Sequence, residues 1–172
     1  MEVEVLKDSL LLALLLVCAY TDVRERRIYN VLTYPVMAAG VLMSIPEGGW
    51  FIVSSFGGLL MGAAVFLPFV WMGGMGLGDV KLLAAVGAVK GFPFVVSAAI
   101  CTALVGGVMA VGLMLLRGET KKTLRRSGEL VASFFGGRKR RRVADVPLAE
   151  TVPYGVAIAL GTICARFTRW PF

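Results

Sequence analysis

The sequence predicts an all-α integral membrane protein, with about six transmembrane helices and a glycine-rich interruption before the fourth. Of its 172 residues, 58% are hydrophobic and only 17% are charged, whereas soluble domains carry about 25% charge. The mean hydropathy is +0.80. The apolar residues form long blocks with the charges between them, as expected for several membrane spans rather than one buried core. We therefore treat residues 1–172 as one polytopic membrane domain.

The six predicted spans follow from where the apolar blocks begin and end. Acidic residues precede the first block, where a signal peptide would need positive charge, so we expect a retained span. Trp50 and Trp71 mark the membrane boundaries of the third, and Thr151 is expected to cap the sixth, with Pro153 in its first turn. The spans are residues 6–20, 28–45, 50–72, 79–89, 92–116 and 151–167.

The fourth segment is too short to cross a membrane by itself. Residues 79–89 form about 16 Å of helix, against a hydrocarbon core of about 30 Å. The preceding glycine-rich run, 73–78, would then lie within the membrane. Irregular backbone is tolerated at that depth only when protein encloses it or it lines a water-filled cavity. The sequence therefore predicts a wet pocket beside Asp79.

Charge between the spans predicts the orientation. The polar loop at 117–150 holds ten of the eighteen Lys and Arg residues and four acids, which places it in the cytoplasm, on anionic lipid headgroups. The polar hinge at 21–27 carries three arginines and falls on the same side. We therefore expect a multi-pass protein of the inner (cytoplasmic) membrane with both termini outside, although Arg166 and Arg169 near the outer C-terminus run against this assignment.

Several function classes find little support. The net charge is +7, but the basic run lacks a folded module with interleaved aromatic residues, so we expect no nucleic-acid binding. Cys18, Cys101 and Cys164 stand alone in apolar segments and the chain has no histidine. Neither a metal site nor a disulfide framework is expected, and we expect no cofactor.

Asp22 and Asp79 are the candidate catalytic residues, because the predicted topology brings both to the cytoplasmic boundary. Two carboxyl groups sharing one proton can hydrolyse a peptide: one takes a proton from water and the other donates to the carbonyl oxygen. Spacing alone leaves alternatives open. Asp22 can pair with Arg26, Asp79 can be a helix N-cap, or both can serve a proton- or cation-coupled carrier. A membrane scaffold without chemistry is a further alternative.

Three motifs follow one another along the chain. The segment from Asp22 to Asn30 places an acid before a basic patch and an Ile-x-Asn, Gly76 to Asp79 reads Gly-x-Gly-Asp, and Pro153 begins Pro-Tyr-Gly. In this order the motifs resemble those of the type IV prepilin peptidases, a family of membrane aspartic endopeptidases that includes the archaeal preflagellin peptidases.

The resemblance implies that Asp22 and Asp79 form the catalytic dyad, and that Gly76 and Gly78 shape the loop that admits the substrate backbone. Lys81 lies two residues past Asp79, on another face of a helix, so an ion pair between them is not expected. Supporting roles fall to the other residues at motif positions: Asn30, Lys81, Pro153, Tyr154 and Gly155.

The implied substrate is a pilin-like or flagellin-like precursor, with a short hydrophilic leader in the cytoplasm and a hydrophobic helix in the membrane. Cleavage would occur at the cytoplasmic membrane boundary, with water as the nucleophile. Larger bacterial members of the family also carry a cysteine-paired domain and N-methyltransferase activity. This sequence has no cysteine pair and few residues before its first span, so we expect a short, peptidase-only form.

Overall fold

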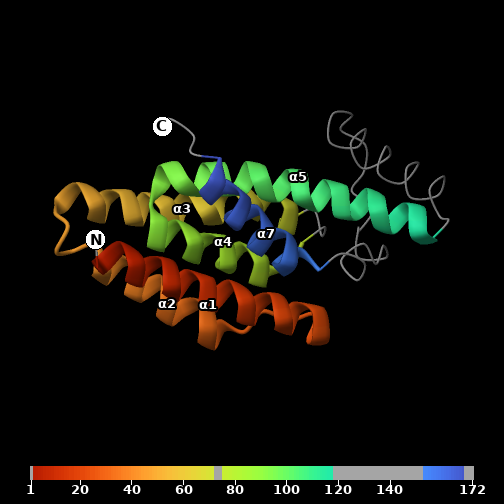
Figure 1. The fold of residues 1–172 in the computed structure, drawn as a ribbon, viewed down its shortest axis with the longest axis horizontal. Coiled ribbons are helices and arrows are strands. Elements are labelled where there is room, and N and C mark those ends of the chain that lie inside the picture. Colours follow the sequence, from red (N-terminus) through yellow and green to blue (C-terminus); the bar gives the residue numbers. More distant parts are fainter. Residues whose placement is uncertain (1, 72–74, 118–152, 169–172) are drawn as a thin grey trace.

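All the secondary structure in the described part of the chain is helical, as the sequence predicts (Figure 1). The structure is a computed structural model that describes residues 2–71, 75–117 and 153–168. The predicted basic loop, from residue 118 onward, and the predicted cap Thr151 lie outside these ranges. The helices are α1 (Glu2–Glu25), α2 (Asn30–Met43), α3 (Gly49–Trp71), α4 (Leu77–Lys90), α5 (Phe92–Arg117) and α7 (Tyr154–Phe167).

Two segments of this helical bundle are long and apolar enough to cross a membrane. They are α3 and residues Phe92–Leu113 of α5, whereas α2 and α7 are apolar but shorter. Helix α1 has an apolar middle and charged residues near both ends. The helical class is therefore confirmed, and the number of membrane crossings stays a prediction.

Helix α1 continues through the segment that the sequence marks as a polar hinge. Residues 21–25 contain neither glycine nor proline, so the helix continues to Glu25. It ends at Arg26, whose φ is +53°, a left-handed conformation that costs a non-glycine residue about 1 kcal/mol.

Helix α7 begins one residue after Pro153. The sequence places Pro153 in the first turn of this helix, but its ψ of 89° is not helical, so Pro153 is the N-cap residue.

Helix α4 lies at the centre of the bundle, enclosed by the other helices (Figure 1). Every residue from Val80 to Val89 except Lys81 is buried. Glycines allow this close packing: a Cβ atom on Gly58 of α3 would lie 2.3 Å from the carbonyl oxygen of Gly87. Because protein covers α4, its length of about 21 Å does not have to match the thickness of a bilayer.

Candidate active site

Asp22 lies near the C-terminal end of α1 and is only 8% exposed. Its Oδ2 atom accepts a hydrogen bond of 2.7 Å from the backbone N–H of Gly155, in the first turn of α7. Arg26 acts on Asp22 through its charge, but no ion pair joins the two side chains within the described residues. The interpretation of Asp22 as the partner of Arg26 is therefore wrong.

The N-terminus of α7 explains why the carboxyl group of Asp22 is held there. The first N–H groups of a helix lack partners within the helix, and the N-cap side chain normally accepts one of them. Pro153, the N-cap residue of α7, makes no such bond. Asp22 takes this role from a different helix, and the helix dipole favours its negative charge.

Gly155 allows Asp22 to lie close to the first turn of α7, because a side chain at position 155 would collide with the aspartate. A Cβ atom on Gly155 would lie 2.9 Å from both the Cβ and the Oδ2 of Asp22, closer than non-bonded atoms pack. The Pro-Tyr-Gly motif therefore provides both the hydrogen-bond donor and the space that Asp22 occupies.

Asp79 lies in the first turn of α4 and is 7% exposed. Its Oδ2 atom accepts the N–H of Gly76, at 3.2 Å. Gly76 is the N-cap residue of α4, and Asp79 is the N3 residue of a capping box with it. Asp79 therefore does take part in capping α4, from the N3 position rather than as the N-cap residue. Gly78 packs against the segment that follows α1, because a Cβ atom on Gly78 would lie 2.9 Å from the Cβ of Ile28.

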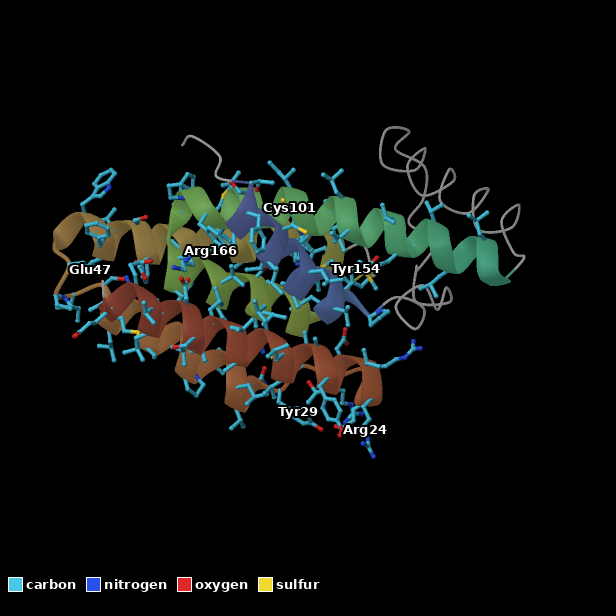
Figure 2. All side chains as sticks on the ribbon, viewed as in Figure 1. Arg24, Tyr29, Glu47, Cys101, Tyr154 and Arg166 are labelled. Atoms are coloured by element: carbon cyan, nitrogen blue, oxygen red, sulfur yellow. The ribbon has the colours of Figure 1, made fainter. Side chains whose placement is uncertain are left out.

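The two aspartates come from distant parts of the sequence to the same end of the bundle. The charge of Asp22 acts on the carboxyl group of Asp79, and the charge of Asp79 acts on the hydroxyl of Tyr154. Figure 2 shows Tyr154 at this end, which we call the dyad end. No group of three or more His, Cys, Asp or Glu side chains suited to a metal ion occurs in the described ranges.

A cavity of about 400 Å³ lies beside Asp79, a volume typical of sites that bind small ligands or parts of larger ones. Tyr29, in its wall, donates a hydrogen bond to Glu25, which raises the pKa of the Tyr29 hydroxyl. Asp22 is not part of the lining. The cavity is lined by Arg26, Arg27, Ile28, Tyr29, Asn30, Gly76, Gly78 and Asp79.

Lys81 bonds to Asn30 rather than to Asp79. Its Nζ atom donates a hydrogen bond of 2.8 Å to Oδ1 of Asn30, and it lies 5.1 Å from the centre of the Tyr34 ring. Within the described residues it makes no ion pair with Asp79, and their spacing of two residues puts the two side chains on different faces of α4. These contacts join α4 to the start of α2, so Lys81 and Asn30 connect two walls of the site.

Four residues of the cavity wall are not among the candidates from sequence: Arg26, Arg27, Ile28 and Tyr29. Ile28 packs against Gly78, and its place in the first aspartate motif is the signal that could have identified it. Arg26 ends α1 in a left-handed conformation. That conformation leaves no sequence signal here, because glycine or asparagine ordinarily marks it.

Residues 9–111, which include both aspartates, match the type IV leader peptidase family. The chain belongs to this family. Among other leader peptidases, the prepilin leader peptidase/N-methyltransferases of Aeromonas hydrophila and Aeromonas salmonicida are each 32% identical to it over 117 residues. That alignment covers 63% of this chain and 40% of each relative. No solved structure matches.

The family match covers only part of the candidate site. The matched residues contain Asp22, Gly76, Gly78 and Asp79 but end before α7. The contact between Asp22 and Gly155 therefore lies partly outside the matched region, and it comes from the structure.

Proposed function

We propose that this chain is an aspartic endopeptidase that removes the leader peptide from type IV pilin-like precursors at the cytoplasmic membrane boundary. The observation that supports the proposal is that two buried aspartates from separate helices, Asp22 and Asp79, lie near enough for the charge of Asp22 to act on Asp79, which lines a cavity. Membership of the leader peptidase family supports peptide hydrolysis as the reaction of this pair. The proposal is limited to peptidase activity, since the chain spans only 40% of the bifunctional relatives.

The proposed chemistry needs one proton shared by the two carboxyl groups. Both groups are buried and repel each other when ionised, so the pair retains a proton. The ionised carboxylate takes a proton from water, whose oxygen attacks the peptide carbonyl carbon, while the protonated carboxyl gives its proton to the carbonyl oxygen. The resulting diol then collapses: the C–N bond breaks, one carboxyl protonates the amine, and the diol returns a proton to the other.

The substrate has to be extended where it meets the dyad. In a helix the scissile carbonyl is already hydrogen-bonded and shielded from water, so the segment between leader and membrane helix must unwind. Gly76 and Gly78 carry no side chains, which leaves room for an extended backbone beside Asp79. The neighbouring cavity of about 400 Å³ supports this arrangement.

We orient the dyad end toward the cytoplasm. Apart from the two aspartates themselves, the charged side chains around it are mostly basic, with Arg24, Arg26, Arg27 and Lys81 against Glu25. Basic residues concentrate on the cytoplasmic side of membrane proteins. The orientation agrees with a substrate whose hydrophilic leader remains in the cytoplasm, and it places the N-terminus of α1 on the outer side.

The experiment is cleavage of a pilin-like precursor by the purified full chain in detergent or lipid. Asp22→Asn and Asp79→Asn, made separately, are each expected to slow cleavage by at least about 10³-fold, because each removes one carboxyl from a pair that works together. Glu2→Gln, which removes an exposed carboxyl from the first turn of α1, is the matched control and should cleave normally.

The same variants separate a peptidase from a proton- or cation-coupled carrier. If either asparagine variant trims the precursor at the wild-type rate, the dyad is not the catalytic pair. If the wild-type chain leaves the precursor intact but moves protons or cations into vesicles in a way that needs Asp22 and Asp79, the carrier replaces the peptidase.

A further inference from the structure

A continuous series of ion pairs lies at the end of the bundle away from the dyad. Its members alternate in charge, and Figure 2 shows two of them, Glu47 and Arg166, away from the dyad end. We call it the far-end network. In order of contact it runs from Glu47 to Lys7, Glu4, Lys90, Asp8 and Arg166.

The far-end network joins the same three helices that build the dyad end. Glu4 and Asp8 belong to α1, which carries Asp22. Lys90 is the last residue of α4, which carries Asp79. Arg166 lies in the last turn of α7, whose first turn holds Gly155. Each helix therefore has a site residue near one end and a network residue near the other.

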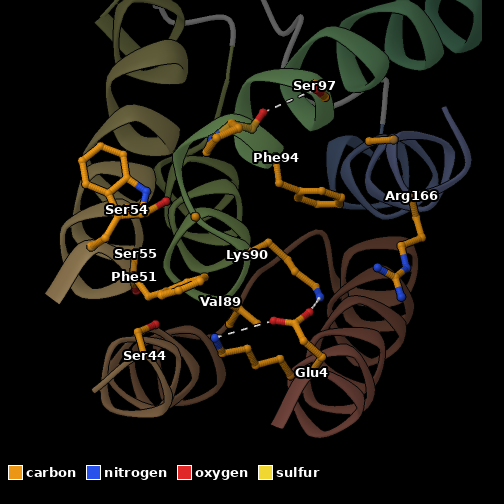
Figure 3. A pocket seen from close by; sticks show the side chains of 15 residues that line it. Glu4, Ser44, Phe51, Ser54, Ser55, Val89, Lys90, Phe94, Ser97 and Arg166 are labelled. Carbon is orange, nitrogen blue, oxygen red and sulfur yellow. Dashed lines mark hydrogen bonds and ion pairs between the residues drawn. The ribbon is translucent and has the colours of Figure 1, made fainter. Parts of the chain in front are cut away.

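Lys90 is the member that connects α4 to α1. Its Nζ atom pairs with Glu4 at 2.8 Å and with Asp8 at 2.5 Å, and its side chain is 7% exposed. Asp8 in turn pairs with Arg166, so the same aspartate extends the connection to α7. Figure 3 shows Lys90 reaching Glu4 with Arg166 nearby, around a cavity of about 430 Å³.

In these pairs the Lys90 ammonium group is buried, whereas its partners Glu4 and Asp8 are 57% and 31% exposed. Exposed carboxylates add little stability, but a buried ammonium group left without a partner is unfavourable, so the pairs fix geometry more than they add stability. An axial shift of α1 against α4 would separate Lys90 from Glu4 and Asp8. Asp22 lies about 27 Å from Glu4 along the same helix. Because a helix is stiff along its axis, an axial shift at Glu4 moves Asp22 by the same amount.

We propose that Lys90 is a positioning residue for the dyad: through Glu4 and Asp8 it sets the axial register of α1 and α7 against α4, and hence the distance from Asp22 to Asp79. This inference rests on the proposed peptidase function for its kinetic readout. The structural part of the inference, the register of the helices, can be measured without any substrate.

Lys7 provides a matched control within the same network. Its side chain is 4% exposed and it also pairs with Glu4, but its other partner is Glu47, in the turn between α2 and α3. Lys7→Met and Lys90→Met therefore remove equal charges from equally buried positions of one cavity. Only the Lys90 variant removes the ion pairs between α4 and α1.

The kinetic test compares these variants of the full chain on a pilin-like precursor. Lys90→Met should lower kcat by about tenfold or more, since displacements of about 1 Å at reacting groups have effects of this size. KM should stay close to wild type, because no far-end residue lines the cavity beside Asp79. Lys90→Arg should restore most of kcat, and Lys7→Met should leave it near wild type. An equal loss of kcat in both methionine variants would overturn the proposal.

The structural test measures the distance between spin labels at positions 23 and 77. Both native side chains, Val23 and Leu77, are exposed and stand next to the aspartates, and the three cysteines would first be replaced by alanine. Lys90→Met should lengthen or broaden the distance distribution, whereas Lys7→Met should not. An unchanged distribution in Lys90→Met refutes the positioning role even if the chain cleaves precursors. If Lys90→Met shifts the distance distribution but the wild-type chain cleaves no precursor, the positioning role of Lys90 is supported and the proposed peptidase function is rejected.

Discussion

The two ends of the bundle hold buried charges in opposite ways. At the far end, each buried lysine faces carboxylates, and the signs alternate along the network. At the dyad end, two carboxyl groups act on each other, and their hydrogen bonds come from the backbone of Gly155 and Gly76. Opposite charges fix a geometry, whereas like charges held by backbone donors keep a site reactive, and such electrostatically unfavourable arrangements concentrate at functional sites.

Gly155→Ala tests the dyad end most directly after the aspartates themselves. The added methyl group would collide with Asp22, so the carboxyl group should move and kcat should fall by about 10²-fold. The control is Gly107→Ala on α5, where nothing lies within 4 Å of the new Cβ. Normal cleavage by Gly155→Ala would mean that the contact with α7 does not position Asp22.

The contrast between the ends also predicts stability changes of opposite sign. Asp79→Asn removes repulsion from Asp22 and should raise the free energy of unfolding by about 1 kcal/mol, as replacing functional residues often does. Asp8→Asn removes the partner of Lys90 and Arg166 and should lower it by about 1 kcal/mol. Denaturant unfolding in detergent measures both. Destabilisation by Asp79→Asn would show that the two acids do not oppose each other.

The smallest effect is expected at the contact between Lys81 and Asn30. Lys81→Met and Asn30→Ala should each reduce cleavage by less than about fivefold, because the hydrogen bond joins walls of the site without touching either carboxyl group. A double-mutant cycle on stability should give a coupling energy of about 0.5–1 kcal/mol. A coupling energy near zero would mean that the hydrogen bond between Lys81 and Asn30 does not contribute to stability.

Much of this arrangement is readable in the chain because it depends on local pattern. Apolar blocks predict the helices. The sequence places the start of the fourth helix at Asp79, whereas α4 begins two residues earlier, at Leu77, with Asp79 in its first turn. The length of α1 is less readable. Polar residues at 21–25 indicate a break, but polar side chains do not by themselves end a helix, and α1 continues to Glu25.

The far-end network could not be predicted, because its pairs join residues far apart in the sequence. Lys90 and Glu4, for example, carry no shared pattern. Arg166 shows why a charge is hard to interpret from its sequence position alone. Its position near the predicted outer end runs against the predicted orientation. In the structure it pairs with Asp8 and is a member of the far-end network.

The enclosed position of α4 bears on how this protein could be inhibited. Asp79 belongs to a helix packed on all sides through close glycine contacts, whereas Asp22 belongs to α1, at the edge of the bundle and held at its two ends. We expect compounds that bind the cavity wall near Gly76 and Gly78 to compete with the extended substrate backbone. Compounds that must also contact Asp22 would bind only when α1 holds Asp22 close to Asp79. Their affinity would therefore depend on the position of α1.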